Sequence, residues 1–425
     1  MAGTADQSSA GGNATASDDA ARPGHNSLAA RRRAWRERYA ESDRAAGIEV
    51  SDDFEPFRQR NDIFTRAFWD PTVRTKETDA FFASYRMEAT PRRGEGFSQR
   101  DFALRNASWL ISDVITARSQ AEGKREGFQS AIRNDTPVAP TRIDVPDPAA
   151  MSIEVKAIAR FFGADLAGIT DFDDRWLYAA RVDVRDFSDA PHDLPEGLTS
   201  VIVLGHAMDR ALVQTYPSAL AGAATGREYS HEAAIVMQVA AYIRNLGYEA
   251  VASMNDTALV IPLAVKAGLG EYGRNQLVIT PQFGPRVRFS KIFTNLPLVH
   301  DAPRRLGIEE VCDVCTRCAA ACPVKALPFG APEATPVSAS SIRGVRKWTS
   351  DAGKCFGYWA KIASDCAICL RVCPFNRDYA RLSGRLWLRL ALSPLRRLAL
   401  WLDDRSRRAT RLKPRDWWSR TAGRG

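Results

Sequence analysis

The sequence predicts an α/β body followed by a small cysteine-rich domain. Between residues 150 and 300, short apolar runs alternate with stretches whose apolar residues recur at helical spacing, a pattern typical of α/β domains. All eight cysteines then fall within the 62 residues from position 312 to 373. A chain of 425 residues is long enough for two or three domains.

The elements of the predicted body follow one another in a regular order. The Pro-rich stretch at 137–148 marks its boundary. A helix is predicted over SIEVKAIARFFG, ending at Gly163, and strands over LAGIT and SVIVLG. Residues 230–247 have apolar residues at helical spacing and a Gly stop. A short helix in ALVIPLAVKAGLG then leads to strands in QLVITP and RFSKIFTNLPL.

Composition divides the chain into five regions. Residues 1–30 are rich in Ala, Gly, Ser and Asp, which predicts disorder, and residues 31–148 are expected to wrap around a larger body. The α/β body takes 149–300, the cysteine-rich domain 301–380, and a basic tail 381–425. The tail holds thirteen Arg and Lys against three Asp, whereas the whole chain carries +9. A basic tail of this kind favours an acidic partner or an anionic surface.

The cysteine spacing predicts two iron–sulfur clusters. Residues 312–323 read CDVCTRCAAACP, which is the C-x2-C-x2-C-x3-C-P run of two-cluster ferredoxins, where the fourth Cys ligates the other cluster. The second run, CAICLRVCP at 366–374, is one Cys short, and Cys355 completes the count. We therefore predict two [4Fe–4S] clusters, the first held by Cys312, Cys315, Cys318 and Cys373, the second by Cys322, Cys355, Cys366 and Cys369.

Other interpretations of these features are weaker. Two zinc sites are the main alternative for the cysteines, but the spacing argues against them. No G-x-G-x-x-G follows a strand and no phosphate-binding loop is present. No run of eighteen apolar residues predicts a membrane span, and the N-terminus lacks the apolar stretch of an export signal. These observations predict a cytoplasmic protein.

Three stretches of the chain resemble one family. PLAVKAGLGEYGRNQLVITPQFGPRVRFSKIFTNLPL (262–298) is similar to the signature block of the cobalamin-dependent reductive dehalogenases, which are relatives of epoxyqueuosine reductase. Residues 152–178 resemble an earlier segment of that family, and residues 343–359 resemble the stretch before its shortened second cysteine motif. The likeness covers roughly residues 150–380.

The resemblance implies a fold and a reaction. The expected fold is a nitroreductase-like α/β core that binds base-off cobalamin, followed by a bacterial-ferredoxin-like domain with two [4Fe–4S] clusters. Electrons would pass through the clusters to cobalt, and a carbon–halogen bond of an organohalide, such as a haloaromatic, would be cleaved with halide release. The chain lacks the D-x-H-x-x-G stretch with which some corrinoid proteins supply an axial His, so we expect no protein His below the corrin.

The same resemblance implies a catalytic set. Tyr229, at the start of the predicted 230–247 helix, is the expected acid, and Asn255 stands where the family's polar assistant would fall. Arg288 and Lys291 are the candidate basic partners, and the sequence does not distinguish between them. An unperturbed phenol has a pKa near ~10, and a nearby cation and a helix N-terminus would both favour phenolate. Tyr272, in GEYGR, is the competing tyrosine.

Three glycines near the signature block have two interpretations. Gly268, Gly270 and Gly273 could let the backbone approach a corrin ring, or they could serve only as a helix stop and turn. These alternatives remain open.

The length of the chain and its basic tail bear on its expected partners. The chain has no room for a fused reductase module, so we expect a separate ferredoxin, flavodoxin or reductase as electron donor, and no nucleic acid. The Arg- and Trp-edged tail could lie on the inner membrane face, dock an acidic donor, or pack on the body with a solvated basic face.

The rival functions are an epoxyqueuosine-reductase-like cobalamin enzyme and a non-catalytic electron-transfer protein. GEYGR stands where the epoxyqueuosine reductases carry a G-W-I-G-K-type block, which weakens the first rival.

Overall fold

The structure, a computed structural model, describes residues 28–85, 94–121, 137–183, 186–192, 194–406 and 408–422. The predicted disorder at 1–30 therefore falls almost wholly outside the described residues. None of the helices within these ranges combines the length and the apolar character that a membrane crossing requires.

A four-stranded antiparallel sheet forms the centre of the body. Its order is β2-β5-β9-β6, with bounds β2 (Leu166–Asp171), β5 (Ser200–Ala207), β9 (Val287–Thr294) and β6 (Ala250–Ser253). The strands β2, β5 and β9 lie within or overlap the stretches that the apolar runs predicted. In β5 every residue except the last is buried, which explains its continuous apolar run.

Helices cover both faces of this sheet. On one face Ile202, Leu204 and Ile292 pack against α5 (Pro148–Phe161) and α7 (Ala219–Asn245). On the other, Val201, Val203 and neighbouring residues pack against α1 (Leu28–Ala46) and α8 (Val260–Lys266). Side chains alternate between the two faces along each strand. The observed body is thus a mixed α/β layer structure, as predicted.

Helix α7 is longer than the sequence predicted. It begins at Ala219 rather than at residue 230, and the Ser218 side chain caps it by accepting a hydrogen bond from Ala221 N at 3.1 Å. The added turns read ALAGAATGREY, whose alanines favour a helix although its two glycines do not, and the stretch shows no apolar periodicity. Tyr229 therefore lies in the interior of α7 and not at its start, and the predicted effect of a helix N-terminus on it was wrong.

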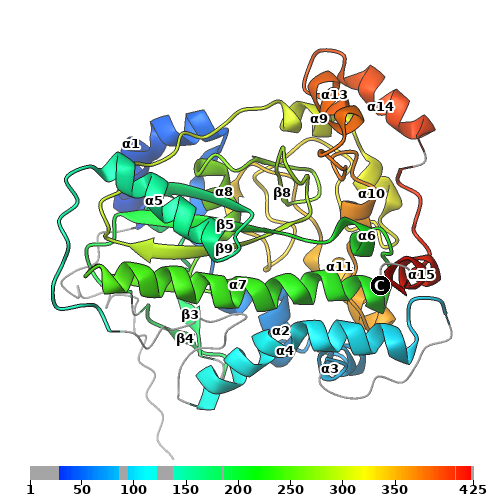
Figure 1. The fold of residues 1–425 in the computed structure, drawn as a ribbon, viewed down its shortest axis with the longest axis horizontal. Coiled ribbons are helices and arrows are strands. Elements are labelled where there is room, and N and C mark those ends of the chain that lie inside the picture. The colour runs from blue at the N-terminus through cyan, green and yellow to red at the C-terminus, as the bar shows by residue number, and fades with distance from the viewer. Residues whose placement is uncertain are drawn as a thin grey trace, which may run out of the picture.

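Small residues bring α4 (Gln99–Ala121) close to α7, as Figure 1 shows along the length of the two helices. A Cβ on Gly226 would lie 2.3 Å from Trp109 Cδ1, and a Cβ on Gly222 would lie 3.2 Å from Arg105 Cδ. Gly226 is therefore required for this close approach, whereas at Gly222 the Arg105 side chain would need to move by only a few tenths of an ångström. This contact fixes Trp109 against α7.

Short elements of the N-terminal region join the body to the cysteine-rich domain. Strand β1 (Val50–Glu55) pairs with β10 (Arg343–Val345), while α2 (Ile63–Trp69) and α3 (Lys76–Ala83) pack against α11 (Ala352–Ile362). The remaining short elements of the chain to this point are η1 (Gln59–Asn61), η2 (Asp174–Trp176), β3 (Arg181–Val182), β4 (Asp189–Ala190), α6 (Arg210–Val213), β7 (Glu271–Tyr272) and β8 (Val278–Ile279).

The cysteine-rich domain consists of short helices and loops. Its helices besides α11 are α9 (Ile308–Val314), α10 (Arg317–Ala321) and α12 (Ile368–Arg371). The basic tail continues as α13 (Leu382–Ala391), α14 (Arg396–Arg405) and α15 (Pro414–Ala422). In Figure 1, α13 and α14 lie together at one corner of the molecule, beside α9.

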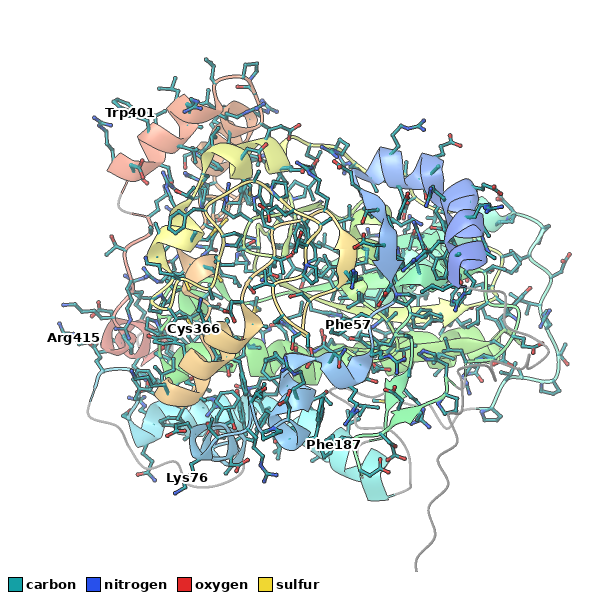
Figure 2. The ribbon with its side chains drawn as sticks, turned by 180° about the vertical axis from the view of Figure 1, so that it is seen from behind. Phe57, Lys76, Phe187, Cys366, Trp401 and Arg415 are labelled. Carbon is teal, nitrogen blue, oxygen red and sulfur yellow. The ribbon has the colours of Figure 1, made fainter. Side chains whose placement is uncertain are left out.

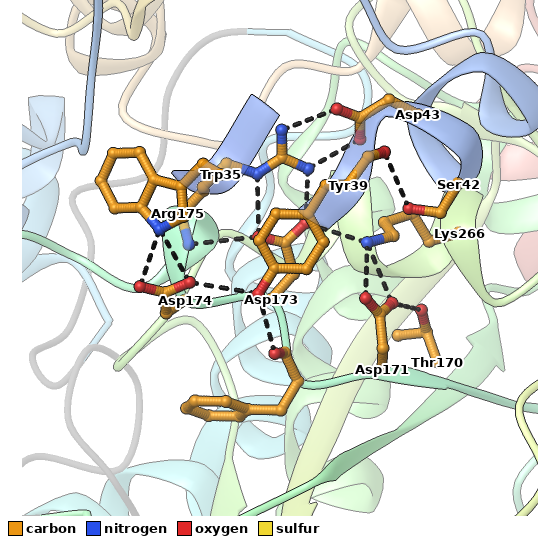
Figure 3. Close-up of polar contacts among 11 residues, drawn as sticks. Trp35, Tyr39, Ser42, Asp43, Thr170, Asp171, Asp173, Asp174, Arg175 and Lys266 are labelled. Carbon is orange, nitrogen blue, oxygen red and sulfur yellow. Dashed lines mark hydrogen bonds and ion pairs between the residues drawn. The ribbon is translucent and has the colours of Figure 1, made fainter. Parts of the chain in front are cut away.

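A buried ionic network fixes α1 to the sheet (Figure 3). Arg175 donates from Nη1 to Asp43 and from Nη2 to Asp173, both at 2.6 Å. Lys266 donates to Asp173 at 2.9 Å and to Asp171 at 3.0 Å. Each cation thus has carboxylate partners, which offset the cost of burying the charges.

Candidate functional site

Four cysteines converge beside α9 and α10. Cys312, Cys315, Cys318 and Cys373 line one small cavity together with Pro374 and Phe375. Burial raises the pKa of the Cys373 thiol, and the charges of Cys312, Cys315 and Cys318 raise it further, which places the four sulfurs near one another. This is the first set that the spacing predicted.

The other four cysteines form a second group. Burial raises the pKa of the Cys369 thiol, and so do the charges of Cys355, Cys366, Cys318 and Cys322, in that order. Apart from Cys318, which belongs to the first group, these are the residues of the second predicted set. The Cys322 sulfur also accepts a hydrogen bond from Ala326 N at 3.3 Å.

The cysteine geometry does not suit a single metal ion. Within the described ranges, no three His, Cys, Asp or Glu side chains converge closely enough to bind one ion together. A zinc ion needs four ligand atoms at about 2.0–2.3 Å, whereas a cubane spreads its thiolates over four separate irons. Two sets of four cysteines match the number of thiolates that two cubane clusters need.

Arg274 links the signature block to the first cysteine group. Its Nε donates to Cys312 O at 3.0 Å and to Cys315 O at 3.1 Å, and its Nη1 donates to Gly330 O at 2.7 Å. Sequence reasoning missed this residue. The only available signal was an Arg within GEYGR, which the pattern does not distinguish from a surface charge.

Three predicted residues from different elements meet at one buried point. Asn255, in the loop after β6, donates from Nδ2 to Tyr229 Oη at 2.7 Å. The guanidinium of Arg288, which is on strand β9, lies 4.2 Å from the centre of the Tyr229 ring. Trp109 stacks on the ring from α4, with centroids 4.8 Å apart. A phenol, an amide and a cation are therefore held together between a helix and the sheet.

Arg288 is a partly buried cation that forms no ion pair with a described carboxylate. Its Nε has no hydrogen-bond partner, and no described carboxylate forms an ion pair with it. Burial lowers the pKa of Arg288 to about 10, and the charges of Tyr216 and Asp365 offset this only in part. At neutral pH the group therefore stays cationic and can attract an anion.

Lys291 does not join this group. Residues 288 and 291 stand three positions apart on β9, so their side chains start from opposite faces of the sheet. The Lys291 amine donates to Met254 O at 2.6 Å and to Asp256 O at 2.9 Å. It thereby fixes the loop that carries Asn255, and of the two candidate cations Arg288 is the one beside Tyr229.

The competing tyrosine and the three glycines lie elsewhere. Tyr272 donates its hydroxyl to Trp348 O at 2.9 Å and lines the large cavity described below. A Cβ on Gly268 or Gly270 would meet Ala302 O or Ile279 O within 2.6 Å, and one on Gly273 would meet the Ile279 side chain at 2.5 Å. The close approaches at these glycines are thus to the chain itself, which accounts for them as turn residues; a cofactor role stays a prediction.

A cavity of about 290 Å³ lies between the body and the cysteine-rich domain. It is lined by Tyr178, whose hydroxyl donates to Asn255 O at 3.0 Å. It is also lined by Ala352, three residues before Cys355 on α11. Apolar and aromatic side chains make up most of its wall, and among its polar groups the Lys347 amine donates to Thr349 Oγ1 at 2.8 Å. The residues that line the cavity therefore include neighbours of Asn255 and of Cys355.

Aromatic residues extend the site away from Tyr229. Tyr85 contacts Trp109 edge-on, with centroids 5.2 Å apart, and the Arg105 guanidinium lies 3.6 Å from the centre of the Tyr85 ring. The Tyr85 hydroxyl also bonds the Asp365 carboxylate, which directly precedes Cys366. Sequence reasoning missed these contacts, because Tyr85 and Arg105 are more than two hundred residues from Asp365 and none of them belongs to a motif.

Comparisons with known proteins agree with both parts of the chain. The family described as "Reductive dehalogenase subunit" matches residues 181–298, and the "4Fe-4S double cluster binding domain" matches residues 311–376. A tetrachloroethene reductive dehalogenase of Sulfurospirillum multivorans is 33% identical over 291 residues, which cover 62% of this chain and 55% of that protein. The enzyme of Dehalobacter restrictus is 35% identical over 278 residues, covering 55% and 50%.

Solved structures give the same fold. A reductive dehalogenase whose structure suggests a mechanism for B12-dependent dehalogenation superposes with a TM-score of 0.66 at 21% identity, covering 86% of this chain and 48% of that one. An epoxyqueuosine reductase of Bacillus subtilis is a more distant relative, 32% identical over 131 residues, or 29% of this chain and 31% of that enzyme. The chain spans about half the length of the dehalogenases it matches. Residues 181–298 therefore match the reductive dehalogenase family, residues 311–376 match a 4Fe–4S double-cluster binding domain, and the chain is similar to reductive dehalogenases across this region.

Proposed function

We propose that this protein reductively dehalogenates an organohalide, replacing C–X by C–H with release of halide, at base-off cobalamin supplied with electrons by two [4Fe–4S] clusters. The observation that carries the proposal is the group formed by Tyr229, Asn255 and Arg288 in a chain that also gathers eight cysteines into two sets of four. Overall, each bond cleaved consumes two electrons and one proton. Tyr229 is the proposed source of the proton, and the clusters are the proposed source of the electrons.

We assign the corrinoid to the region of the cavity between the body and the cysteine-rich domain by the character of several lining residues, since its volume of about 290 Å³ holds only part of such a macrocycle. Its walls include Trp176, Val265, Tyr272 and Trp348, which suit the faces of a large macrocycle, while Lys347 and its polar neighbours at 349 and 350 suit polar substituents. When bound there, cobalamin would supply the low-valent cobalt that breaks the carbon–halogen bond. The cysteines would hold the clusters in the two sets of four given above.

Tyr229 is the proposed proton donor. Asn255 donates a hydrogen bond to its oxygen at 2.7 Å, and this bond strengthens as negative charge develops on that oxygen. Arg288, at 4.2 Å from the ring, also stabilises that charge. Because Arg288 has no ion pair with a described carboxylate, it can also attract the departing halide. Lys291 is a positioning residue, since it holds the two carbonyls that flank Asn255.

The experiment is reconstitution followed by an assay of halide release. The chain is loaded with iron, sulfide and cobalamin, then incubated with haloaromatics under a strong reductant. One suitable compound is 3-bromo-4-hydroxybenzoic acid, which a solved relative binds. Halide released in step with the dehalogenated product supports the proposal. A preparation with intact clusters that binds no corrinoid would refute it and would favour an electron-transfer protein.

We further propose that electrons come from a separate ferredoxin, flavodoxin or reductase. We place the protein in the cytoplasm, with peripheral contact to the inner membrane face through its basic tail. The support is the charge of the tail, thirteen Arg and Lys against three Asp, and its position beside the first cysteine group.

A further inference from the structure

Helices α13 and α14 form a hairpin that exposes an unusual number of large apolar side chains. Its outer residues are between 43% and 64% exposed. We call them the hairpin surface: Leu382, Leu386, Leu395, Leu398, Trp401 and Leu402. On α13 the exposed leucines are four positions apart, and the leucines of α14 follow at intervals of three and four, so each set shares one helix face. Contiguous exposed apolar surface of this kind indicates a binding site.

The opposite side of the hairpin is fixed to the first cysteine group. Trp387 and Leu400 belong to the buried cluster that also contains Cys312 and Cys315. Trp387 Nε1 donates to Ala399 O at 2.9 Å, which joins the two helices. The hairpin is thus a rigid part of the cluster domain.

A second set of contacts anchors the far end of α14. Arg317, on the helix that carries Cys318, donates to Leu400 O at 2.6 Å and pairs with Asp403. Arg377 pairs with Asp403 as well. Asp403 is buried and paired with both arginines, whereas Asp404 is exposed and pairs with Arg317 at 2.7 Å.

The exposed charges around the hairpin surface are mainly basic, with Asp404 as an exposed acidic residue. Arg385, Arg389, Arg397 and Arg405 are exposed on the same two helices, and Arg405 lies over the Trp401 ring at 3.5 Å. In Figure 2, Trp401 lies at the outer edge of the molecule. Leucines and a tryptophan bordered by arginines are the composition of helices that lie in a lipid interface, with the arginines toward anionic headgroups.

We infer that the hairpin surface seats the protein on an anionic lipid bilayer, with α13 and α14 lying in the headgroup region. A soluble electron donor fits less well, since transient electron-transfer contacts are small and would leave six large apolar side chains in water between encounters. A bilayer covers them continuously and matches the basic rim. Binding in this orientation would place the first cluster on the side of the molecule that faces the membrane. The position of the cluster rests on the proposed function, whereas the lipid binding does not.

The test is co-sedimentation of the cluster-loaded full chain with two kinds of vesicle. One kind mixes phosphatidylglycerol with phosphatidylcholine, and the other is phosphatidylcholine alone. We expect clear binding to the mixed vesicles, weaker binding to the neutral ones, and a decrease with salt. Neutralising Arg389 and Arg397 with Gln should weaken binding about fivefold each.

The decisive variant combines Leu398→Glu, Trp401→Glu and Leu402→Glu. It should lose at least about tenfold in affinity, because apolar burial drives the insertion. The matched control is Ile153→Glu with Phe161→Glu, two exposed apolar residues on α5, at 71% and 80%, which should bind like the unmodified chain. Cluster absorbance verifies folding, and the milder Leu398→Gln, Leu402→Gln pair replaces the triple variant if it does not fold.

Three results would overturn the inference. The unmodified chain could fail to bind the mixed vesicles, or the hairpin variant could bind them as well as the unmodified chain does. If the unmodified chain binds no vesicles and a soluble donor reduces the hairpin variant more slowly, the hairpin surface is a protein-docking surface instead. Dehalogenation itself is unaffected by these outcomes when a chemical reductant is used, so the two proposals fail separately.

Discussion

Two buried tyrosines differ in whether the cations beside them form ion pairs with carboxylates. The centre of the Tyr39 ring lies 4.3 Å from the Arg175 guanidinium and 4.8 Å from the Lys266 amine. Asp173 binds both cations, while Asp43 binds Arg175 and Asp171 binds Lys266 (Figure 3). Tyr229 lies 4.2 Å from Arg288, which has no ion pair with a described carboxylate. In the first region both buried cations are paired with carboxylates, and in the second the cation is not.

This difference separates a structural site from a reactive one. A fully matched network holds elements together and loses stability when one member is removed. An unmatched cation costs stability, and proteins keep such groups chiefly where a ligand or a reaction uses the charge. Substitutions in the Tyr39 region should therefore change folding, and substitutions in the Tyr229 region should change turnover.

The largest expected effect is that of Tyr229→Phe. The variant lacks the acidic proton, so halide release should fall about 10²–10⁴-fold, the range in which general acid–base groups contribute. Stability, iron content and cobalt content should stay unchanged, because the ring and its Trp109 contact remain. Full turnover in this variant would show that the acid is another residue, with Tyr272→Phe as the comparison.

Asp173→Asn tests the matched region. The side chain of Asp173 is fully buried and binds both Arg175 and Lys266, so the variant should lose about 3–5 kcal/mol of unfolding free energy in a denaturant titration. Its turnover per folded molecule should be normal. Asp52→Asn, an exposed partner of Arg36, is the control and should change stability by less than about 1 kcal/mol. Equal losses in both variants would contradict the distinction.

Lys291→Met should have an intermediate effect on turnover. The substitution removes the donor to Met254 O and Asp256 O, so Asn255 is held less firmly against Tyr229. Turnover should fall about 10–100-fold, as expected for a small misplacement of a catalytic group, while Tyr229→Phe in the same background should cost less than it does alone. Strict additivity of the two losses would indicate that Lys291 acts independently of the tyrosine.

The smallest effect concerns pH and Glu228, on α7 next to Tyr229. Burial raises the pKa of Glu228 to about 7, so the folded protein binds a proton that the unfolded chain has released. Stability should therefore fall as the pH rises from about 4.5 to 7, by about 1–2 kcal/mol. Glu228→Gln should flatten this slope in denaturant titrations at several pH values. A variant with the slope of the unmodified chain would assign the pH dependence to other groups, such as Glu232.

Local patterns in the sequence were sufficient for some of these features. Cluster ligands stand at fixed short intervals, so Cys312, Cys315 and Cys318 could be recognised without a fold. The strands β5 and β9 were predictable because their burial gives continuous apolar runs. Tyr229, Asn255 and Arg288 were proposed through the family resemblance alone, and the structure brings them together.

Features that depend on distant contacts could not be predicted. Asp43 and Arg175 are 132 residues apart in sequence, and nothing local in either segment indicates the pair. The start of α7 was misplaced because the glycines and alanines at 219–226 reflect close packing against Trp109 and not an apolar face. The different orientations of Arg288 and Lys291 follow from the strand geometry of β9, which a single sequence only suggests.

The most direct test of the central claim is the metal content of the reconstituted, purified chain. If the chain binds cobalamin together with two clusters, each chain should hold eight iron atoms, four for each cluster, and one cobalt. Narrowing the cavity with Val265→Trp, at a residue that lines it, should remove the cobalt and leave the iron. Iron without cobalt in the unmodified chain would contradict the account.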